Sequence, residues 1–360
     1  MGVIGLGHFA QAAILPAFRY LDDVELTALV SGSTKKRDAL RDRYEVEHAV
    51  DYDALDELLD LDRVDAVYIA LPPDMHAEYA IKCARRGVHV LCEKPMAPSE
   101  EDCRAMIAAC EAARVRLMIA YRLHFEAANL TAIDLAQGGK LGEPRFFVSS
   151  FSQQVREHNI RVQPRPGAGP LFDMGIYCIN AARYLFRDEP YEVIAAAATN
   201  QLDARFKHAD EAVAATLRFP NGKLASFVTS FGAHDRAHYE VVCTEGVLSL
   251  DQSYEYAADM KLTVENGVGP RQRTFHKRDQ IAAEIEYFVK CVREGIDPEP
   301  SGYEGLADIR IIEAINRAVR TGRAEAIEPI ERPRRPDLDQ EIRVPPHGPP
   351  RLVEVESASQ

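Results

Sequence analysis

The sequence predicts an α/β fold with two domains, a parallel sheet with helical crossovers followed by an α+β domain. Three observations support this prediction. The chain has 360 residues, more than a single hydrophobic core usually supports. Short apolar runs alternate with helical patterns as far as residue 121, as they do in parallel sheets. Beyond that point strand patterns follow one another directly, which indicates an α+β domain.

The first domain is expected to span residues 1–121. Its predicted strands are rich in Val, Ile and Leu, as strands buried on both faces are. They are Val3–Ile4, Val24–Val30, Ala66–Leu71, Val88–Cys92 and Leu117–Ala120. Apolar residues at three- and four-residue spacing predict helices at Ala77–Arg86 and Glu100–Arg114.

The second domain is expected to span residues 122–328, with a Pro-rich extended arm at 329–360. Helices are predicted at Ala127–Gln137, Ile281–Arg293 and Tyr303–Val319. The strands expected between them are Val193–Ala198, Val213–Phe219, Leu224–Phe231, Tyr239–Cys243, Val247–Leu250 and Met260–Val264. Asn221-Gly222 between two of these strands is a strong hairpin signal.

Composition narrows the class of partner. The formal net charge is −13, which disfavours nucleic acid and anionic membrane surfaces, so small molecules are the expected ligands. The seven cysteines are expected to be buried thiols in a reducing compartment. They lack metal-ligand spacing, so no metal is expected. No run approaches the length of a membrane-spanning helix, and the chain opens directly on a strand. A cytoplasmic location is therefore expected.

A glycine-rich motif follows the first strand and opens a helix. Gly5-Leu6-Gly7-His8-Phe9-Ala10 has the G-x-G-x-x-A form of a dinucleotide-binding Rossmann fold. Gly5 permits the tight turn, and Gly7 lets the backbone approach a pyrophosphate at the helix N-terminus. The alternative is a plain strand-to-helix connection. The position on strand one of an alternating β/α domain favours nucleotide binding.

The end of the second strand indicates NADP, with NAD less favoured. NAD-binding domains carry an acid there that contacts the ribose hydroxyls, and this chain has Ser31. The following run, Gly32 to Arg37, supplies hydroxyls and cations suited to a 2′-phosphate. Alternatively, Ser33 or Thr34 merely caps the next helix. Both interpretations can hold together.

Two further segments carry candidate catalytic groups. Glu93-Lys94-Pro95 ends a strand at the carboxyl edge, where ligands bind in open α/β sheets. A Gly-rich loop, Gly167 to Pro170, enters a helix on which Asp173 and Tyr177 share a face. Taken alone, the lysine reads as a surface residue, and the Asp and Tyr as ordinary helix residues.

Together these motifs resemble the glucose-fructose oxidoreductase and inositol dehydrogenase family (Gfo/Idh/MocA). Gly5 to Ala10, Leu71-Pro72-Pro73, Glu93-Lys94-Pro95 and Asp173-x-x-x-Tyr177 carry the resemblance, which spans roughly residues 1–327. Most members have His in place of Tyr177, so the chain looks closest to the glucose-fructose oxidoreductase branch. In that branch an N-terminal arm helps to retain the nucleotide, and this chain begins at its first strand.

The resemblance implies a fold and a set of site residues. It implies a large open, mostly antiparallel sheet in the second domain that forms dimers or tetramers. It also implies that Lys94, Asp173 and Tyr177 are catalytic, and that the Lys94-Pro95 bond is cis. The expected cofactor contacts are Gly5, Gly7, His8, Phe9, Ala10, Ser31, Gly32, Ser33, Lys36, Arg37, Leu71, Pro72, His76, Glu93 and Lys94. The expected sugar contacts are Tyr121, Arg122, His124, Arg161, Asp173 and Tyr177, with His158 a weaker candidate.

The expected reaction is hydride transfer between a nicotinamide and a sugar or polyol carbon, most simply C1 of an aldose to give a lactone. A free phenol has a pKa of about 10, so it needs an activating cation such as Lys94 to act near neutral pH. One alternative is a sugar-sugar oxidoreductase with tightly bound NADP. Another is a non-catalytic regulator that senses the nucleotide, since folds can lose catalysis and keep binding.

Overall fold

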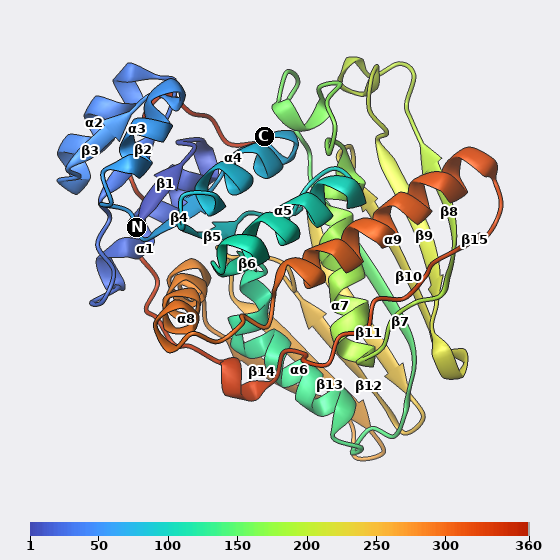
Figure 1. Ribbon diagram of the computed structural model, residues 1–360. Helices are drawn as coiled ribbons and strands as arrows, with labels where there is room; N and C mark the ends of the chain where they lie inside the picture. The colour runs from blue at the N-terminus through green and yellow to red at the C-terminus, as the bar shows by residue number, and fades with distance from the viewer. Residues whose placement is uncertain (359–360) are drawn as a thin grey trace. The chain divides into compact units, whose positions relative to one another are not determined.

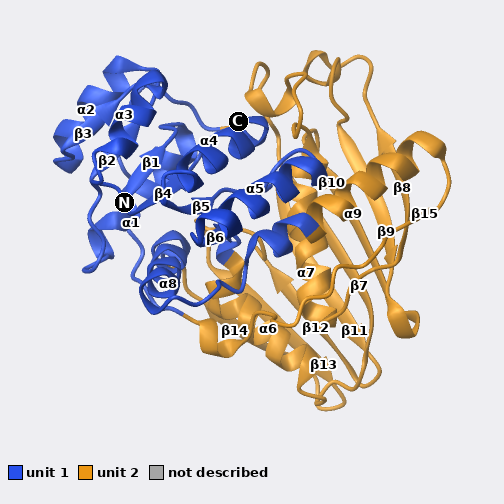
Figure 2. Ribbon diagram, viewed as in Figure 1, with its two compact units in different colours: residues 1–122, 279–306, 342–357 blue, residues 123–278, 307–341, 358–360 orange. Residues whose placement is uncertain are grey.

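The computed structural model describes residues 1–358 and divides into two compact units, coloured separately in Figure 2. Unit 1 comprises Met1–Arg122, Asp279–Leu306 and Ile342–Ser357. Unit 2 comprises Leu123–Arg278, Ala307–Glu341 and residue 358. The sequence-based division is linear and places residues 279–306 in the second domain. The structure groups them with unit 1, where helix α8 (Gln280–Glu294) packs against strand β5 (His89–Cys92).

Unit 1 is built on a parallel sheet of six strands in the order β3-β2-β1-β4-β5-β6 (Figure 1). The strands not yet introduced are β1 (Gly2–Ile4), β2 (Ala28–Val30), β3 (His48–Val50), β4 (Ala66–Ile69) and β6 (Leu117–Ile119). This order is that of a Rossmann fold, so the predicted fold class is confirmed. The strand order reverses between β1 and β4, and ligands of such sheets bind beyond the carboxyl ends at that point.

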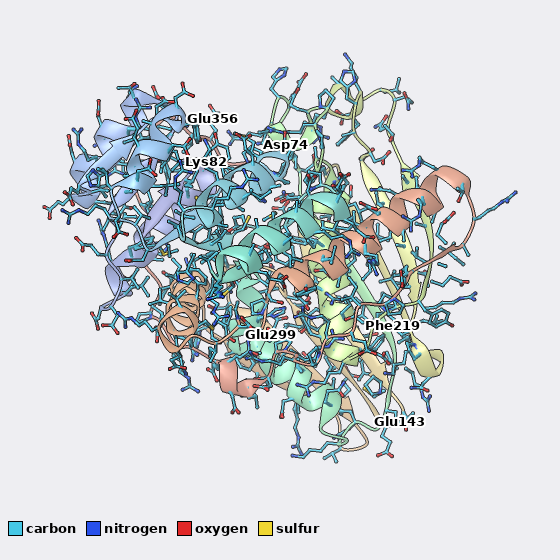
Figure 3. The ribbon with its side chains drawn as sticks, in the orientation of Figure 1. Asp74, Lys82, Glu143, Phe219, Glu299 and Glu356 are labelled. Atoms are coloured by element: carbon cyan, nitrogen blue, oxygen red, sulfur yellow. The ribbon has the colours of Figure 1, made fainter. Side chains whose placement is uncertain are left out.

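Several helical segments lie in unit 1, and some of them begin at a side-chain cap. They are η1 (Ala10–Ile14), α1 (Leu15–Ala17), η2 (Phe18–Tyr20), α2 (Thr34–Tyr44), η3 (Tyr52–Ala54), α3 (Leu55–Asp60), α4 (Pro73–Ala84), α5 (Glu100–Ala113) and α8. Ser33 and Ser99 cap α2 and α5 through their hydroxyls. Asp74 in the first turn of α4 and Lys82 in its last turn, both labelled in Figure 3, complement the helix dipole.

Unit 2 contains a nine-stranded sheet in the order β14-β13-β12-β11-β7-β10-β9-β8-β15 (Figure 1). The bounds are β7 (Pro144–Ser152), β8 (Glu192–Ala198), β9 (Ala212–Arg218), β10 (Leu224–Ser230), β11 (Arg236–Cys243), β12 (Gly246–Asp251), β13 (Met260–Asn266), β14 (Arg271–Phe275) and β15 (Glu325–Ala326). Strands β7 and β10 are parallel and the other neighbours are antiparallel. The predicted hairpin is confirmed: Asn221 and Gly222 have φ of 59° and 74° between β9 and β10.

One face of this sheet forms the core of unit 2. Phe147, Phe227 and Tyr239 alternate with outward-facing residues and are at most 2% exposed, and helices α6 and α7 contact the sheet. The helical segments are η4 (Arg122–Phe125), α6 (Ala127–Gln137), η5 (Ile160–Val162), η6 (Leu171–Gly175), α7 (Ile176–Phe186), η7 (Ala204–Phe206), η8 (Pro220–Gly222), α9 (Gly302–Thr321) and η9 (Leu338–Gln340).

The segment after Pro329 is largely irregular, as its proline content predicts, but it docks on its own chain. Arg187 of unit 2 donates a hydrogen bond to the Pro336 carbonyl at 3.3 Å. Residues 342–357 belong to unit 1. All seven cysteines are free and buried, as predicted. Among residues 1–358 no helix combines the length and apolarity needed to span a bilayer.

Candidate active site

The glycine-rich motif joins β1 to the helical segment that begins with η1. At two positions of the motif the fold requires a small residue. Gly5 has φ of +98°, and a Cβ there would lie 2.5 Å from the Ala70 carbonyl oxygen. Only glycine fits such a turn. Ala10 is 1% exposed, so a small side chain at this position allows close packing of helix and sheet.

Of the remaining motif residues, Leu6 is buried, whereas Gly7, His8 and Phe9 are at least partly exposed. A Cβ on Gly7 would meet no atom within 4 Å, so packing within the chain does not require glycine there. His8 and Phe9 are half-exposed in the first helical turn. A bound pyrophosphate would explain a glycine at Gly7, because a side chain would separate the backbone N–H groups from the anion. The geometry fits a dinucleotide.

The end of β2 carries the groups expected to meet the adenosine. Ser31 is buried, and its hydroxyl accepts a hydrogen bond from the Ser33 N–H at 3.3 Å. Ser33 caps α2 by accepting from the Lys36 N–H at 3.3 Å, while Lys36 is half-buried and Gly32 is exposed. The capping interpretation is confirmed, and the nucleotide interpretation stays a prediction that the cap does not oppose.

Arg37 differs from the other cations of this run. Its guanidinium donates to Asp51 Oδ2 at 2.7 Å and also to the Ser31 carbonyl. This pairing neutralises the charge and braces the loop after β2. Lys35 is also paired, 2.8 Å from a Glu354 carboxylate oxygen, but its side chain is 72% exposed. The sequence analysis includes Lys35 in the cationic run but names only Lys36 and Arg37 as cofactor contacts, because spacing alone does not show which side chain the fold engages.

His76 ties together the two segments that follow β4 and β5. The imidazole is fully buried, with Nε2 2.8 Å from the Leu71 carbonyl and Nδ1 3.0 Å from the Pro95 carbonyl. Burial lowers the pKa of His76. The Lys94-Pro95 peptide is cis, as the resemblance implied. His76 thus positions the segments that contain Pro72 and Lys94, and its burial favours this bracing role over direct contact with a cofactor.

Beside Lys94, Glu93 is part of a carboxyl pair that the sequence analysis missed. The Tyr68 hydroxyl lies 2.7 Å from Glu93 Oε1 and 2.9 Å from Oε1 of Glu284, on α8. One hydroxyl has one proton, so both carboxyls are satisfied only if one of them is protonated. Burial raises the pKa of Glu284 well above its usual range, and the neighbouring Glu93 adds to this effect. Burial also raises the pKa of Glu93, but Lys94 opposes that shift, so the proton of the pair is favoured on Glu284.

The candidates at the end of β6 are buried. Tyr121 and Arg122 are each 5% exposed, and the Arg122 guanidinium donates to Oε1 of Gln280 on α8. His124 is 1% exposed, with Nε2 2.8 Å from Asn180 Oδ1. These contacts fix the side chains of Arg122 and His124. Their burial favours structural contributions over direct sugar contacts.

In unit 2, Arg161, Asp173 and Tyr177 form one cluster. The Arg161 Nε donates to Asp173 Oδ2 at 2.7 Å. The Asp173 carboxylate raises the pKa of Arg161, with a smaller contribution from Tyr177. Gly169, at φ +98°, donates its N–H to the Arg161 carbonyl at 3.0 Å and so closes the loop onto the arginine. The structure brings together these predicted residues, and His158 lies apart with a side chain that is 87% exposed.

The Tyr177 ring is positioned by aromatic neighbours. Phe151 packs edge-on at 5.6 Å between ring centroids, and Tyr254 lies at 5.8 Å. The Tyr254 hydroxyl is itself fixed 2.6 Å from the Ser149 hydroxyl. Tyr177 is half-buried, so the ring is held on its faces and edge while part of the side chain remains accessible. Such packing suits a phenol that must meet a substrate in one orientation.

A cavity of about 480 Å³ lies in unit 2 beside the Gly-rich loop. Its lining combines apolar residues with hydrogen-bonding side chains, among them Arg165, Lys207, His208 and Asn316. Hydrogen-bonding side chains of this kind suit a hydroxylated small molecule.

Comparison with known proteins agrees with this arrangement. Residues 1–121 match the model of the oxidoreductase family with an NAD-binding Rossmann fold, and residues 129–249 match the GFO/IDH/MocA C-terminal domain. A D-xylose 1-dehydrogenase [NADP(+)] of Haloarcula marismortui is 32% identical over 330 residues, covering 89% of this chain and 90% of the relative.

Solved structures are similar over the same extent. The aldose-aldose oxidoreductase of Caulobacter crescentus, complexed with glycerol, has a TM-score of 0.86 and 34% identity. It covers 91% of this chain and 98% of that structure. The 3-ketoreductase KijD10 of Actinomadura kijaniata, in complex with NADP and TDP-benzene, has a TM-score of 0.80 and 26% identity, covering 88% of this chain and 96% of that one. The chain belongs to the Gfo/Idh/MocA family of oxidoreductases.

Proposed function

We propose that this chain is an NADP-dependent oxidoreductase that transfers a hydride between the nicotinamide and a sugar or polyol carbon. The simplest reaction is oxidation of an aldose at C1 to its lactone. The observation that carries the proposal is the nucleotide edge of unit 1. There Gly7 leaves the backbone open, Ser31 stands where an NAD-specific acid would, and the half-exposed Lys94 follows at the end of β5.

Gly5 to Ala10 would hold the pyrophosphate of the cofactor, and Ser33 with Lys35 would receive its 2′-phosphate. NADP supplies the hydride acceptor when it is bound. The chain supplies the proton chemistry: the Tyr177 phenol takes the proton from the reacting hydroxyl, and a cation must favour the phenolate because an ordinary phenol has a pKa of about 10. Lys94 fills this role in the proposal.

Arg161 and Asp173 contribute beside Tyr177 within unit 2. The 2.7 Å contact fixes the arginine, so a second cation stands near the phenol. We assign Asp173 to positioning Arg161, and both residues to orienting the sugar hydroxyls.

Relatives with sugar substrates support this proposal, among them the NADP(+)-dependent xylose 1-dehydrogenase and the aldose-aldose oxidoreductase. The test is a panel of aldoses, polyols and inositols, in which the absorbance of the reduced cofactor is followed with NADP and with NAD. We expect at least one aldose to be oxidised, faster with NADP. A panel without any turnover, for a chain that binds NADP, would contradict the proposed activity.

A second candidate is a sugar-sugar oxidoreductase, which the similarity to the aldose-aldose oxidoreductase favours. In that reaction one sugar reduces a retained NADP and another sugar reoxidises it. Gel filtration of the purified chain separates the two candidates. The second candidate is supported if the cofactor elutes with the protein and added NADP is not reduced. An empty protein that turns over added NADP supports the first.

We also propose a homo-oligomer assembled through the outer face of the unit 2 sheet, and a cytoplasmic location. Phe146, Val148, Ile194, Leu224 and Val228 are 42–49% exposed and alternate with buried residues on neighbouring strands. Exposed apolar side chains gathered on one face of a sheet mark an association surface. The free, buried cysteines are consistent with a reducing compartment.

A further inference from the structure

The C-terminal segment 351–357 docks on unit 1 beside the proposed nucleotide edge. It is the red end of the ribbon in Figure 1 and part of the blue unit in Figure 2. The Val353 N–H donates to Gln11 Oε1 at 2.7 Å, and Gln11 Nε2 donates to the Val353 carbonyl at 3.0 Å. Gln11 is 1% exposed and belongs to η1, the helix that the glycine-rich motif opens. The segment is therefore anchored through a buried amide.

The next residue, Glu354, reaches the cations after β2. Its carboxylate lies 2.8 Å from Lys35 Nζ and accepts a hydrogen bond from the Ser33 hydroxyl at 3.1 Å. The Lys35 ammonium and the Ser33 hydroxyl lower the pKa of Glu354, so the group is ionised at neutral pH. Arg43 at the end of α2 donates to the Arg351 carbonyl and holds the segment at a further point.

The position of Glu354 matters because the end of β2 has no acid of its own. Dinucleotide folds that prefer NAD place a carboxylate at the end of the second strand, and folds that prefer NADP place cations there. Here Ser31 removes the local acid, yet Glu354 returns a carboxylate to the same cations from the other end of the sequence. A fixed acid and a 2′-phosphate cannot share Ser33 and Lys35.

We propose that Glu354 determines nucleotide specificity: it occupies the anion site formed by Ser33 and Lys35, and so competes with the 2′-phosphate of NADP but not with NAD. This inference rests on the proposed function, since it refines the cofactor site assigned there. The 2′-phosphate must displace Glu354 before it reaches Lys35. NAD has a hydroxyl in place of the phosphate, so Glu354 stays where it is when NAD binds.

The exposure of the Lys35–Glu354 ion pair sets the expected change in NADP affinity. The side chains of Lys35 and Glu354 are 72% and 41% exposed, and ion pairs of this kind are weak. We therefore expect the carboxylate to weaken NADP binding by about two- to fivefold, a cost that a phosphate can overcome. Added salt should shrink the difference, because it screens exposed charges.

The test compares the full-length chain with its Glu354→Gln variant. Dissociation constants for NADP and NAD are measured by fluorescence titration at low and at high salt. Asp22→Asn is the matched control, because it removes one exposed acid of unit 1 away from this site. We expect Glu354→Gln to bind NADP about two- to fivefold more tightly at low salt, with NAD binding unchanged. Asp22→Asn should change neither. Equal NADP affinity in wild type and Glu354→Gln, or equal shifts for both nucleotides, would overturn the proposal.

A second pair of variants tests whether Lys35 mediates the effect. In a Lys35→Met background, Glu354→Gln should no longer alter NADP binding, whereas an undiminished effect contradicts competition at Lys35. A chain ending at Pro350 should behave like Glu354→Gln. If the wild type binds neither nucleotide, the proposed function itself fails and the inference falls with it. If the wild type binds NADP and Glu354→Gln matches it, only the inference fails.

Discussion

At the residue scale, Ser31 stands in the proposed site at the position where NAD-binding folds carry an acid. It is buried at the end of β2, and its hydroxyl contacts the Ser33 N–H. Ser31→Asp would place a negative charge beside the 2′-phosphate and offer an acceptor to a ribose hydroxyl. We predict that this variant binds NADP about tenfold less tightly, a difference of about 1.4 kcal/mol, and NAD more tightly.

Titration of both nucleotides checks this prediction. The matched control is Ser31→Asn, which has a similar size and no charge. If Ser31→Asp and Ser31→Asn have the same affinity for NADP, then charge at this position does not select the nucleotide.

Glu284 gives unit 1 a pH dependence that can be measured. Its pKa is raised by burial and then by Glu93, so the folded state favours the protonated form. Stability from this group is fully present below the unfolded pKa of about 4.3 and is lost as the pH rises toward the folded pKa. Glu284→Gln replaces the protonated acid with an amide that does not titrate. We predict similar thermal unfolding of variant and wild type near pH 4, and a more stable variant at pH 8.

Unfolding curves recorded across this pH range test whether folding raises the pKa of Glu284. The control is Glu286→Gln, which removes an exposed acid two residues further along α8. Parallel stability curves for wild type and Glu284→Gln would show that folding does not raise the pKa of Glu284.

The sequence analysis identified those residues whose role depends only on the backbone next to them. Gly5 is required by a carbonyl 2.5 Å from its missing Cβ, and the motif spacing expresses that constraint directly. Glu284 could not be found in this way, because its partner Tyr68 is 216 positions away. The same holds for Val353, which meets Gln11 across 342 positions.

At the scale of elements, α7 is fixed by a buried polar network. Arg183 on α7 is fully buried and donates to Asp308 Oδ1 of α9 at 2.6 Å and to Glu189 Oε2 at 2.7 Å. Asn180 Nδ2 donates to the other Asp308 oxygen at 3.0 Å. Because Tyr177 lies on the same helix, this network also orients the proposed catalytic phenol.

Removing Asp308 should expose how much α7 depends on the network. Asp308→Ala leaves the buried Arg183 with one carboxylate fewer and removes one acceptor of the Asn180 amide. We predict a loss of about 3 kcal/mol in the free energy of unfolding, measured with urea. Asp308→Asn keeps the shape and loses the charge, so it should fall between alanine and wild type. A loss below 1 kcal/mol in Asp308→Ala would contradict the role given to the pair.

Elements with clear apolar periodicity were predicted from the sequence, and α6 has the predicted bounds, Ala127–Gln137. Strands β3 (His48–Val50) and β14 (Arg271–Phe275) were missed. The first is short and half-buried throughout, and the second is polar and mostly exposed at the sheet edge. Neither strand has the alternation of apolar and polar residues that marks a buried strand. Each is held in its sheet by backbone hydrogen bonds to a neighbouring strand, which leave no pattern in the side chains.

At the scale of the whole molecule, the apolar outer face of the unit 2 sheet predicts self-association. Val148 and Val228 are 46% and 49% exposed on the adjacent strands β7 and β10. We predict that the wild type is a dimer or tetramer by light scattering and that Val148→Lys has the mass of a single chain. Leu202→Lys, at a loop residue that is 97% exposed, should leave the assembly intact. A monomeric wild type, or an unchanged mass for Val148→Lys, would rule out this interface.

The central claim is that a lysine and a tyrosine act on one sugar beside one NADP. The most direct measurement is turnover of the best aldose by Lys94→Ala and Tyr177→Phe, with NADP affinity measured on the same samples. We predict that each variant loses about 10²- to 10⁴-fold in kcat and still binds NADP. Near wild-type kcat in either variant would contradict the account.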